Sequence, residues 1–287
     1  ATMAANALLS VHGWRSDQVE LVPMIASGDK ILDRALAEIG GKALWTKELD
    51  RALAKGEIDC AVHSMKDVET IRPGEFILAA MLERADVHDR LIGADSIDAL
   101  ADRAIVGTAS PRRKAQLLRL RSDLDIRLIR GNVQSRLQKI EDGDYDATLL
   151  AAAGLNRLEM GDVGTDISNE VMLPAPAQGA IGIEARSDDP HVRRLLSAIS
   201  STNTFRAVTA ERLFLERLTA DCHSPVAALA TIEGATVHLR AEILLPDGSE
   251  CIDGQSSFDT GEVSAPGILA ETLLGQASAE LKAVFGR

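Results

Sequence analysis

Five apolar runs between residues 59 and 154 alternate with helical patterns, and this alternation constrains the fold more than any other feature. The runs are 59–65, 76–82, 104–110, 125–131 and 147–154. Their nearly continuous apolar character is typical of strands that are covered on both faces of a sheet. Helical patterns at 112–120 and 133–141 separate the later runs. This rhythm predicts an α/β fold with largely parallel, doubly wound sheets.

The N-terminal segment continues this α/β pattern, whereas the last third of the chain has a different one. Residues 19–25, VELVPMI, predict a further strand, and a helical pattern with Leu44, Leu49 and Leu53 follows. In the last third, residues 204–218 predict a helix, TVHLRAEILL alternates as a strand does, and PDG predicts a hairpin turn. One final helix is expected to bury Leu269, Leu273, Ala277, Leu281 and Val284. The C-terminal part is therefore predicted to be a small α+β unit.

Length and charge exclude several functional classes. A chain of 287 residues has room for two or three domains. The net charge of −12 and the 3% aromatic content argue against a nucleic-acid-binding protein. No apolar run reaches the length that spans a membrane, so no membrane association is expected. We expect a cytoplasmic protein. An organelle is left open, because Ala1 runs straight into a helical pattern and we expect that the natural start is missing.

Basic side chains gather where the predicted strands of the middle segment end. Between positions 112 and 139 there are nine Lys or Arg residues and only two acids. Ser110 is a plausible N-cap, with Pro111 as the first helical residue. Ligands of open α/β sheets bind at the carboxyl ends of the strands. The pattern predicts a specific anionic ligand, for which arginine forks suit carboxylates or phosphates.

Cys222 stands beside His223 on a predicted turn, and its chemistry is open from the residues alone. The three cysteines, Cys60, Cys222 and Cys251, have no CxxC spacing, and their odd number argues against a disulfide framework. The scattered histidines argue against a metal site, and none is expected. Taken alone, Cys222 is best interpreted as a structural thiol.

Six motifs resemble the porphobilinogen deaminase (hydroxymethylbilane synthase) family, in the family's order and over nearly the whole chain. They are AVHSMKDV (61–68), IVGTASPRRKAQL (105–117), LIRGNVQSRLQK (128–139), DATLLAAAGLNRL (146–158), LPAPAQGAIGIE (173–184) and LTADCHSPVA (218–227). The resemblance implies a transferase of tetrapyrrole and heme biosynthesis. Such an enzyme joins four porphobilinogens head to tail, releases ammonia and forms hydroxymethylbilane.

The resemblance also implies roles for individual residues. Cys222 would carry a dipyrromethane cofactor through a thioether, and Asp67 would assist catalysis at the pyrrole nitrogens. The arginines that would bind acetate and propionate groups are Arg112, Arg113, Arg130, Arg136 and Arg157. Ser64, Lys66, Thr108, Ser110 and Gln178 fall in matching cofactor or substrate motifs, and Asp29 and Lys42 match lining positions. The partner expected is porphobilinogen alone, bound by a monomer.

The family fold implies three domains, two of which resemble type II periplasmic binding proteins. Domain 1 would comprise residues 1–84 and 180–199, domain 2 residues 88–174, and domain 3 residues 202–287. The chain would cross between the first two domains near Ala85 and near 174–180. This discontinuity follows from the resemblance and not from periodicity.

The chain departs from the family pattern at three places. The family's opening strand, followed by Thr-Arg-x-Ser-Pro-Leu-Ala-Leu, is absent, and we expect that it precedes Ala1 in the whole protein. Glu69 stands where the family commonly has proline, and Ala177 stands where it commonly has glycine. Neither of these two substitutions removes a charge that the mechanism needs, whereas the resemblance implies that the opening motif supplies an arginine and a serine near the active site.

Two other functions compete with this interpretation. A two-lobed, non-catalytic protein that binds a small anion could use the same arginines, but it would not need a thiol at Cys222. A Cys–His hydrolase is disfavoured, because adjacent side chains on a turn diverge and no third group orients the histidine.

Overall fold

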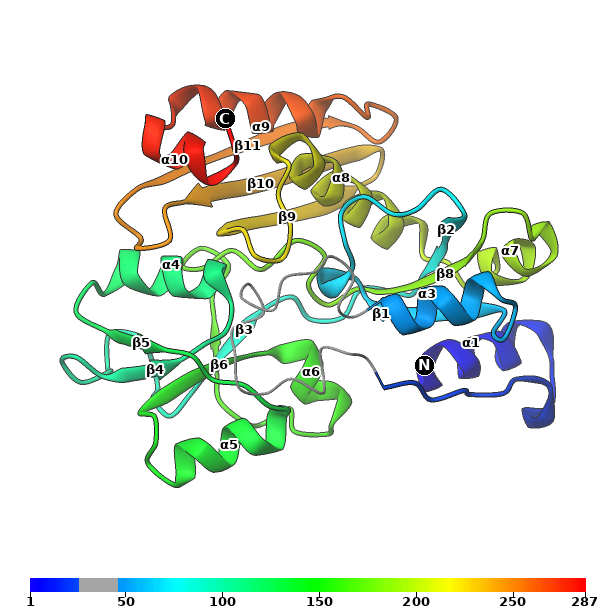
Figure 1. The fold of residues 1–287 in the computed structure, drawn as a ribbon, viewed down its shortest axis with the longest axis horizontal. Coiled ribbons are helices and arrows are strands. Elements are labelled where there is room, and N and C mark those ends of the chain that lie inside the picture. The colour runs from blue at the N-terminus through cyan, green and yellow to red at the C-terminus, as the bar shows by residue number, and fades with distance from the viewer. Residues whose placement is uncertain (26–45) are drawn as a thin grey trace.

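The structure, a computed structural model, describes residues 1–25 and 46–287. Its strands form three separate sheets (Figure 1). The first has the order β1–β8–β2, with β1 (Cys60–Ser64), β8 (Ile181–Arg186) and β2 (Phe76–Met81). Helices α1 (Thr2–His12), α3 (Lys47–Ala54) and α7 (Pro190–Ser197) belong to the same part of the chain. Ala80, Ile183 and Leu196 form the centre of its core.

The prediction of largely parallel sheets is wrong for the described strands of the first sheet. β8 runs antiparallel to both β1 and β2. The reason is topological, because β8 returns from the second sheet and enters between two strands that precede it by about 100 residues. The strand predicted at 19–25 is also wrong. That segment is irregular, although Val19 packs against the core of this part.

The second sheet is mixed and has the order β5–β4–β6–β3–β7. Its strands are β5 (Asp125–Arg127), β4 (Ile105–Gly107), β6 (Ala147–Ala151), β3 (Asp89–Ile92) and β7 (Thr165–Ile167). The strands predicted from apolar runs pair in parallel as β5–β4–β6, whereas β3 runs antiparallel to β6 and β7. Helices α4 (Pro111–Leu120), α5 (Val133–Glu141) and α6 (Ala152–Arg157) follow the parallel strands. This arrangement confirms the predicted α/β units in the middle of the chain.

The third sheet is an antiparallel meander, β9 (Val226–Glu233), β10 (Thr236–Leu244) and β11 (Cys251–Asp259). Helices α8 (Thr202–Leu218) and α9 (Ala265–Gln276) pack side by side on it. The small α+β unit is therefore confirmed. The prediction of a single C-terminal helix is wrong. Ala277 is extended, and Ser278 caps a separate helix α10 (Ala279–Val284) by accepting a hydrogen bond from the Leu281 N–H.

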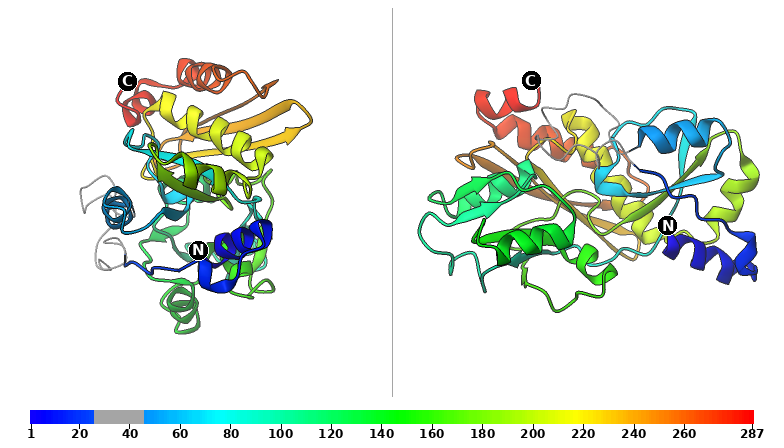
Figure 2. Two further views of the ribbon diagram at one scale, coloured as in Figure 1. Left: turned by 90° about the vertical axis from the view of Figure 1, so that its right-hand side faces the viewer. Right: turned by 60° about the horizontal axis from the view of Figure 1, so that its bottom comes forward.

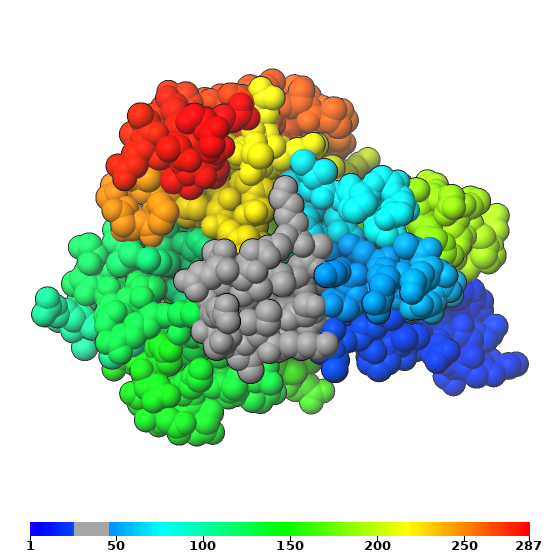
Figure 3. Space-filling model, viewed as in Figure 1, coloured from blue at the N-terminus to red at the C-terminus, as the bar shows by residue number. Residues whose placement is uncertain are grey.

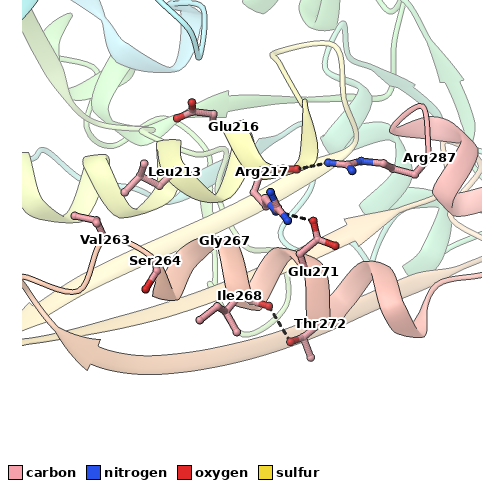
Figure 4. Close-up of a pocket in the computed structure, with 10 residues that line it drawn as sticks. All are labelled: Leu213, Glu216, Arg217, Val263, Ser264, Gly267, Ile268, Glu271, Thr272 and Arg287. Atoms are coloured by element: carbon pink, nitrogen blue, oxygen red, sulfur yellow. Dashed lines mark hydrogen bonds and ion pairs between the residues drawn. The ribbon is translucent and has the colours of Figure 1, made fainter.

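A shallow groove runs between α8 and α9 (Figure 4). An ion pair between Arg217 and Glu271, 2.6 Å long, crosses it, and Arg287 donates to the Arg217 carbonyl. None of the residues that line the groove is a predicted site residue. None of the helices in the described part of the chain has the length and apolar content that crossing a membrane requires.

The two chain segments that connect the first two sheets lie beside each other and are fastened to α8. The Ala85 N–H donates to the Gly179 carbonyl, and the Arg84 guanidinium forms an ion pair of 2.7 Å with Glu211 on α8. Glu211 is fully buried and also accepts from the N–H groups of Ala177 and Ala230. Ala177 has a φ of 62°, the left-handed region that favours glycine, which explains why glycine suits this position.

The C-terminal unit contacts both other parts of the chain, because β10 contacts α4 and α8 contacts β2 (Figure 3). Gly248, in the turn between β10 and β11, lies against the backbone of α4. A Cβ added at Gly248 would lie 2.5 Å from the backbone nitrogen of Arg119. Behind it, Gln116 of α4 donates to the buried Glu242 of β10. Helix α8 lies against both the third sheet and β2, and Figure 2 shows it from two further sides. The C-terminal unit therefore contacts α4, whose N-cap is Ser110, and β2.

Candidate active site

The first part of the site is the turn that follows β1. After Ser64, residues Met65–Asp67 form one 3₁₀ turn. Met65 is buried among Met81 and Val208, and its N–H donates to the Ala180 carbonyl. Because Met65 is held in the core, Lys66 and Asp67 project from it and remain partly exposed. The turn therefore presents a cation and a carboxylate next to each other.

Lys66 connects this turn electrostatically with the second sheet. Burial lowers the pKa of Lys66, and the neighbouring cations Arg113 and Arg112 lower it further. The carboxylates of Asp67 and Asp89 act in the opposite direction. The ammonium of Lys66 therefore lies within the field of groups from two different parts of the chain.

Helix α4 begins as the sequence predicts. Ser110 is its N-cap and accepts from the Arg113 N–H at 3.4 Å, and Pro111 is the first helical residue. The hydroxyl of Thr108, which is buried, accepts from the Ser110 N–H at 3.1 Å. These contacts fix the direction in which the first turn of α4 presents Arg112 and Arg113.

Arg112 and Arg113 are buried and form ion pairs with Asp89, a residue that the sequence analysis did not identify. Asp89, at the start of β3, accepts from Arg112 at 2.8 Å and from Arg113 at 2.7 Å. Gln178 donates to the same carboxylate at 2.9 Å. Burial alone would raise the pKa of Asp89, but the two guanidinium groups hold it well below its ordinary value. Asp89 is therefore ionised and fixes both arginines.

This arrangement changes what Arg112 and Arg113 can offer a ligand. The two Nη atoms of Arg112 donate to Asp89, to Gln116 and to the Leu173 carbonyl, and those of Arg113 donate to Asp89 and to the Leu149 carbonyl. The Nε atoms of both arginines and the Oε1 atom of Gln178 are buried and have no hydrogen-bond partner among the described residues. The open anion site expected at the first turn of α4 is therefore largely occupied by Asp89.

Two further arginines, Arg130 and Arg136, belong to the same electrostatic neighbourhood as Arg113. Arg136, in the first turn of α5, donates to the Gly131 carbonyl at 2.9 Å. Burial lowers the pKa of Arg136 to about 10, and repulsion from Arg113 and Arg130 adds to the effect. Like charges held together in this way favour the binding of an anion. We call Arg113, Arg130 and Arg136 the arginine cluster.

Arg157 lies at the end of α6 and donates to the Gly179 carbonyl at 3.0 Å. It therefore contacts one of the two connecting segments and is not among the cations that shift the pKa of Arg136. Asp29 and Lys42 lie outside the described residues. Within the described ranges, no group of three or more His, Cys, Asp or Glu side chains could hold a metal ion.

Cys222 lies on an exposed turn between α8 and β9. Asp221 shapes the turn by accepting from the His223 N–H at 2.8 Å. The surrounding protein partly desolvates the thiol and raises its pKa to about 11, and Asp221, Asp67 and Glu69 add to the shift. All three cysteines are free thiols. Asp67 and Cys222 are 155 positions apart in the sequence, yet the carboxylate acts on the thiol.

A network of charges lies beneath the turn that carries Asp67. Arg72 forms ion pairs with Asp50 at 2.5 Å, Glu69 at 2.8 Å and Glu184 at 2.8 Å. Glu184, on β8, also pairs with the buried His63 at 3.0 Å. Glu69 further accepts from the Thr46 hydroxyl. The glutamate that replaces the family's usual proline is therefore part of this network.

Substitution of Glu184 by glutamine is expected to lower the free energy of unfolding at pH 7 by roughly 3 kcal/mol. Burial would raise the pKa of Glu184, but His63 and Arg72 lower it from 4.5 to about 2. A depressed pKa stabilises the fold above pH 4.5, and this stabilisation is lost as the pH falls toward 2. The difference between wild type and variant should therefore narrow from pH 7 to pH 3 in denaturant titrations.

The exposed Glu75 provides the control, because Glu75→Gln should leave the pH dependence of stability as in wild type. Parallel pH profiles for wild type and Glu184→Gln would contradict the assigned ion pairs.

Comparisons with known proteins identify the family. The model described as "Porphobilinogen deaminase, dipyromethane cofactor binding domain" matches residues 1–194, and "Porphobilinogen deaminase, C-terminal domain" matches residues 205–275. The chain is 52% identical to a porphobilinogen deaminase of Sphingopyxis alaskensis, over 99% of this chain and 92% of that protein. It is 47% identical to a porphobilinogen deaminase of Paracoccus denitrificans, over 95% of this chain and 88% of that protein. The chain belongs to the porphobilinogen deaminase family.

Membership of the family supports the transferase interpretation and not the binding-protein alternative. The chain is a transferase of porphyrin biosynthesis whose first 194 residues match a dipyrromethane-binding domain. Solved structures that resemble it include a periplasmic His/Glu/Gln/Arg/opine family-binding protein from Silicibacter pomeroyi, with a TM-score of 0.38, 15% identity, and coverage of 73% of this chain and 83% of that one. Another is an amino acid ABC transporter substrate-binding protein from Streptococcus pneumoniae, with a TM-score of 0.36 and 13% identity. The match covers 69% of this chain and 75% of that one. These scores are low, and the family assignment rests on the sequence matches alone.

Proposed function

We propose that this chain joins four porphobilinogens head to tail on a dipyrromethane held by Cys222, with Asp67 as the catalytic carboxylate and the arginine cluster as the binding site for carboxylate side chains. The cofactor, when bound, supplies the pyrrole to which the first substrate is joined. One observation carries the proposal. The Asp67 carboxylate influences both the Cys222 thiol and the Lys66 ammonium, and Lys66 in turn lies within the field of Arg112, Arg113 and Asp89. The same acid thus acts on a free thiol and on a lysine that is within the field of the buried arginines.

The chemistry of the reaction matches these groups. Porphobilinogen loses ammonia when the C–N bond of its aminomethyl group breaks, and the remaining azafulvenium ion is a cation. A carbon–carbon bond then forms to the terminal pyrrole, which afterwards loses a proton from the attacked carbon. A carboxylate fixed at Asp67 stabilises the positive charge as it develops. Because Asp67 is partly exposed on a turn fixed by Met65, it can meet a substrate without rearrangement of the core.

The proposed anchor fits the residues around Cys222. The thiol is free, exposed on a turn and within the field of Asp67. A thioether at this position would place a polypyrrole next to the acid that acts on it. Asp89 supports this arrangement, because it fixes Arg113, which acts electrostatically on Arg136. The other family positions, Ser64, Thr108, Ser110, Arg157 and Gln178, are proposed to line the same site.

Substitution of Arg136 by glutamine tests the binding role. A charge-assisted hydrogen bond contributes about 1.5–3 kcal/mol, so kcat/KM for porphobilinogen should fall roughly 10- to 150-fold. Loading of the cofactor is measured in parallel by intact mass. Arg127→Gln is the matched control, because Arg127 is exposed and pairs with Asp125. Equal kcat/KM values for Arg136→Gln and Arg127→Gln would contradict the assignment.

We also propose that the chain is a cytoplasmic monomer with the three domains 1–84 with 180–199, 88–174 and 202–287. Each of the three sheets draws all of its described strands from one of these ranges, which supports the division. The proposed catalytic and anchoring residues come from one chain, which supports the monomer. Sedimentation equilibrium at the concentration of the assay tests it.

A further inference from the structure

Arg212 makes an unusual set of contacts with the segment that follows Asp67. Its guanidinium donates to three successive backbone carbonyls, those of Val68 at 3.3 Å, Glu69 at 2.6 Å and Thr70 at 2.9 Å. These residues begin immediately after Asp67. In the described part of the chain, all of the hydrogen bonds of the Arg212 side chain go to these carbonyls, and none goes to a carboxylate.

The position of Arg212 on α8 explains how it reaches this segment. Val208 lies one helical turn earlier on the same face and is packed with Met65 and Val68 in one buried cluster. Glu211, the preceding residue, is fully buried and bound to Arg84, which fixes the rotation of α8 about its axis. The helix therefore directs Arg212 toward the carbonyls of residues 68–70.

The charges around Arg212 also leave its guanidinium group available to donate to these carbonyls. Burial lowers the pKa of Arg212, and the carboxylates of Glu184 and Glu69 oppose this effect. Both of these acids pair directly with Arg72. Arg72 therefore pairs with Glu69 and Glu184. The Arg212 guanidinium donates to the backbone carbonyls instead. Because the contact at position 69 is to a carbonyl, it does not depend on the side chain there.

A further hydrogen bond joins the segment after Asp67 to the C-terminal unit. The Thr70 hydroxyl donates to the Ala220 carbonyl at 2.9 Å, and Ala220 lies two residues before Cys222. The segment after Asp67 is thus fastened to the C-terminal unit at two points, on α8 and at the start of the turn that carries the thiol.

We propose that Arg212 is a positioning residue, which sets the Asp67 carboxylate at a fixed place relative to Cys222 by holding the carbonyls of residues 68–70. The inference rests on the roles proposed for Asp67 and Cys222. A planar fork with several donors can serve three carbonyls at once, whereas the single ammonium of lysine cannot match this geometry. Small displacements of a catalytic group cost large factors in rate. The residue therefore acts on turnover without touching the substrate.

The test compares Arg212→Lys with Arg206→Lys, a control at an exposed position of the same helix. Intact mass, melting temperature, kcat and KM for porphobilinogen are measured for both. Arg212→Lys is expected to carry the cofactor and to show a kcat lowered about tenfold or more, with KM within about threefold of wild type. Arg206→Lys should behave as wild type. Thr70→Val, which removes the hydrogen bond to the Ala220 carbonyl, should lower kcat in the same way but less.

A double-mutant cycle with Asp67→Asn decides whether Arg212 acts through Asp67. If it does, Arg212→Lys will have little further effect on the residual kcat of Asp67→Asn. An equal factor in both backgrounds, or a change confined to melting temperature or cofactor loading, would overturn the positioning role while leaving the proposed function intact. Normal turnover by Asp67→Asn alone would instead overturn the role of Asp67, and the positioning inference with it.

Discussion

Substitution of Cys222 by serine is expected to yield a protein that lacks the mass of two pyrrole units and does not turn over porphobilinogen. Wild type should exceed its sequence mass by those two units. The reason is chemical, because a serine hydroxyl is a much weaker nucleophile than a thiol and does not form the stable thioether. Intact mass spectrometry of both proteins, purified in the same way, measures the difference directly.

Cys251→Ser is the matched control for this experiment. Cys251 is also a free thiol in the C-terminal unit, and burial together with Glu242 raises its pKa to about 12. Its sulfur lies 3.8 Å from Glu242 and belongs to the contact between the third sheet and α4. Cys251→Ser should keep the added mass. A wild-type mass equal to that of the bare sequence, or loss of the added mass in Cys251→Ser and not in Cys222→Ser, would contradict the proposed anchor.

Substitution of Asp67 by asparagine is expected to leave the cofactor in place and to lower kcat by roughly 100-fold or more. Asparagine keeps the size of the side chain and its place on the 3₁₀ turn but removes the negative charge that is proposed to stabilise the developing cation. The thioether should survive, because its formation depends on Cys222. Steady-state kinetics with porphobilinogen, normalised to the loaded fraction from intact mass, provide the measurement.

Asp221→Asn separates a specific role of Asp67 from a general effect of negative charge near the thiol. Asp221 also raises the pKa of Cys222, but it is exposed, and asparagine can still accept from the His223 N–H. Its kcat should stay within about threefold of wild type, as for surface substitutions. The assignment of Asp67 would not stand if Asp67→Asn were fully active or if both variants lost the same fraction of kcat.

Local patterns predicted the fold where neighbours in sequence are neighbours in space. The apolar runs at 104–110, 125–131 and 147–154 contain β4, β5 and β6, which pair in parallel with one another. Ser110 caps α4 as its residue type predicts. The direction of β8 could not be predicted from periodicity, because an antiparallel strand that returns from another sheet has the same apolar pattern as a parallel one.

Two failures have local physical causes. Residues 19–25 have strand-forming side chains but no strand partner among the described residues, and propensity without a partner does not make a strand. The C-terminal helix was predicted as continuous, because its apolar face continues from Leu269 to Val284. It breaks because Ser278 caps a new helix and donates from its N–H and hydroxyl to Glu250.

Among the proposed site residues, sequence motifs located the arginines but not the groups that fix them. Asp89 follows a polar segment and has no motif of its own, yet it binds both Arg112 and Arg113. The excess of basic residues at 112–139 was a signal that a buried acid from elsewhere could balance some of them. Arg212 gave no such signal, because its contacts are with carbonyls that every residue possesses.

The raised pKa of the Cys222 thiol has a consequence for its reactivity toward oxidants and alkylating agents. With a pKa of about 11, only roughly one thiol in ten thousand is ionised at pH 7. Thiolates are the form that peroxides and mild alkylating agents attack, so an exposed cysteine of this kind resists adventitious oxidation. Desolvation of the thiol, reinforced by the carboxylates around it, thus confers chemical selectivity and would preserve the proposed anchor for a strongly electrophilic pyrrole.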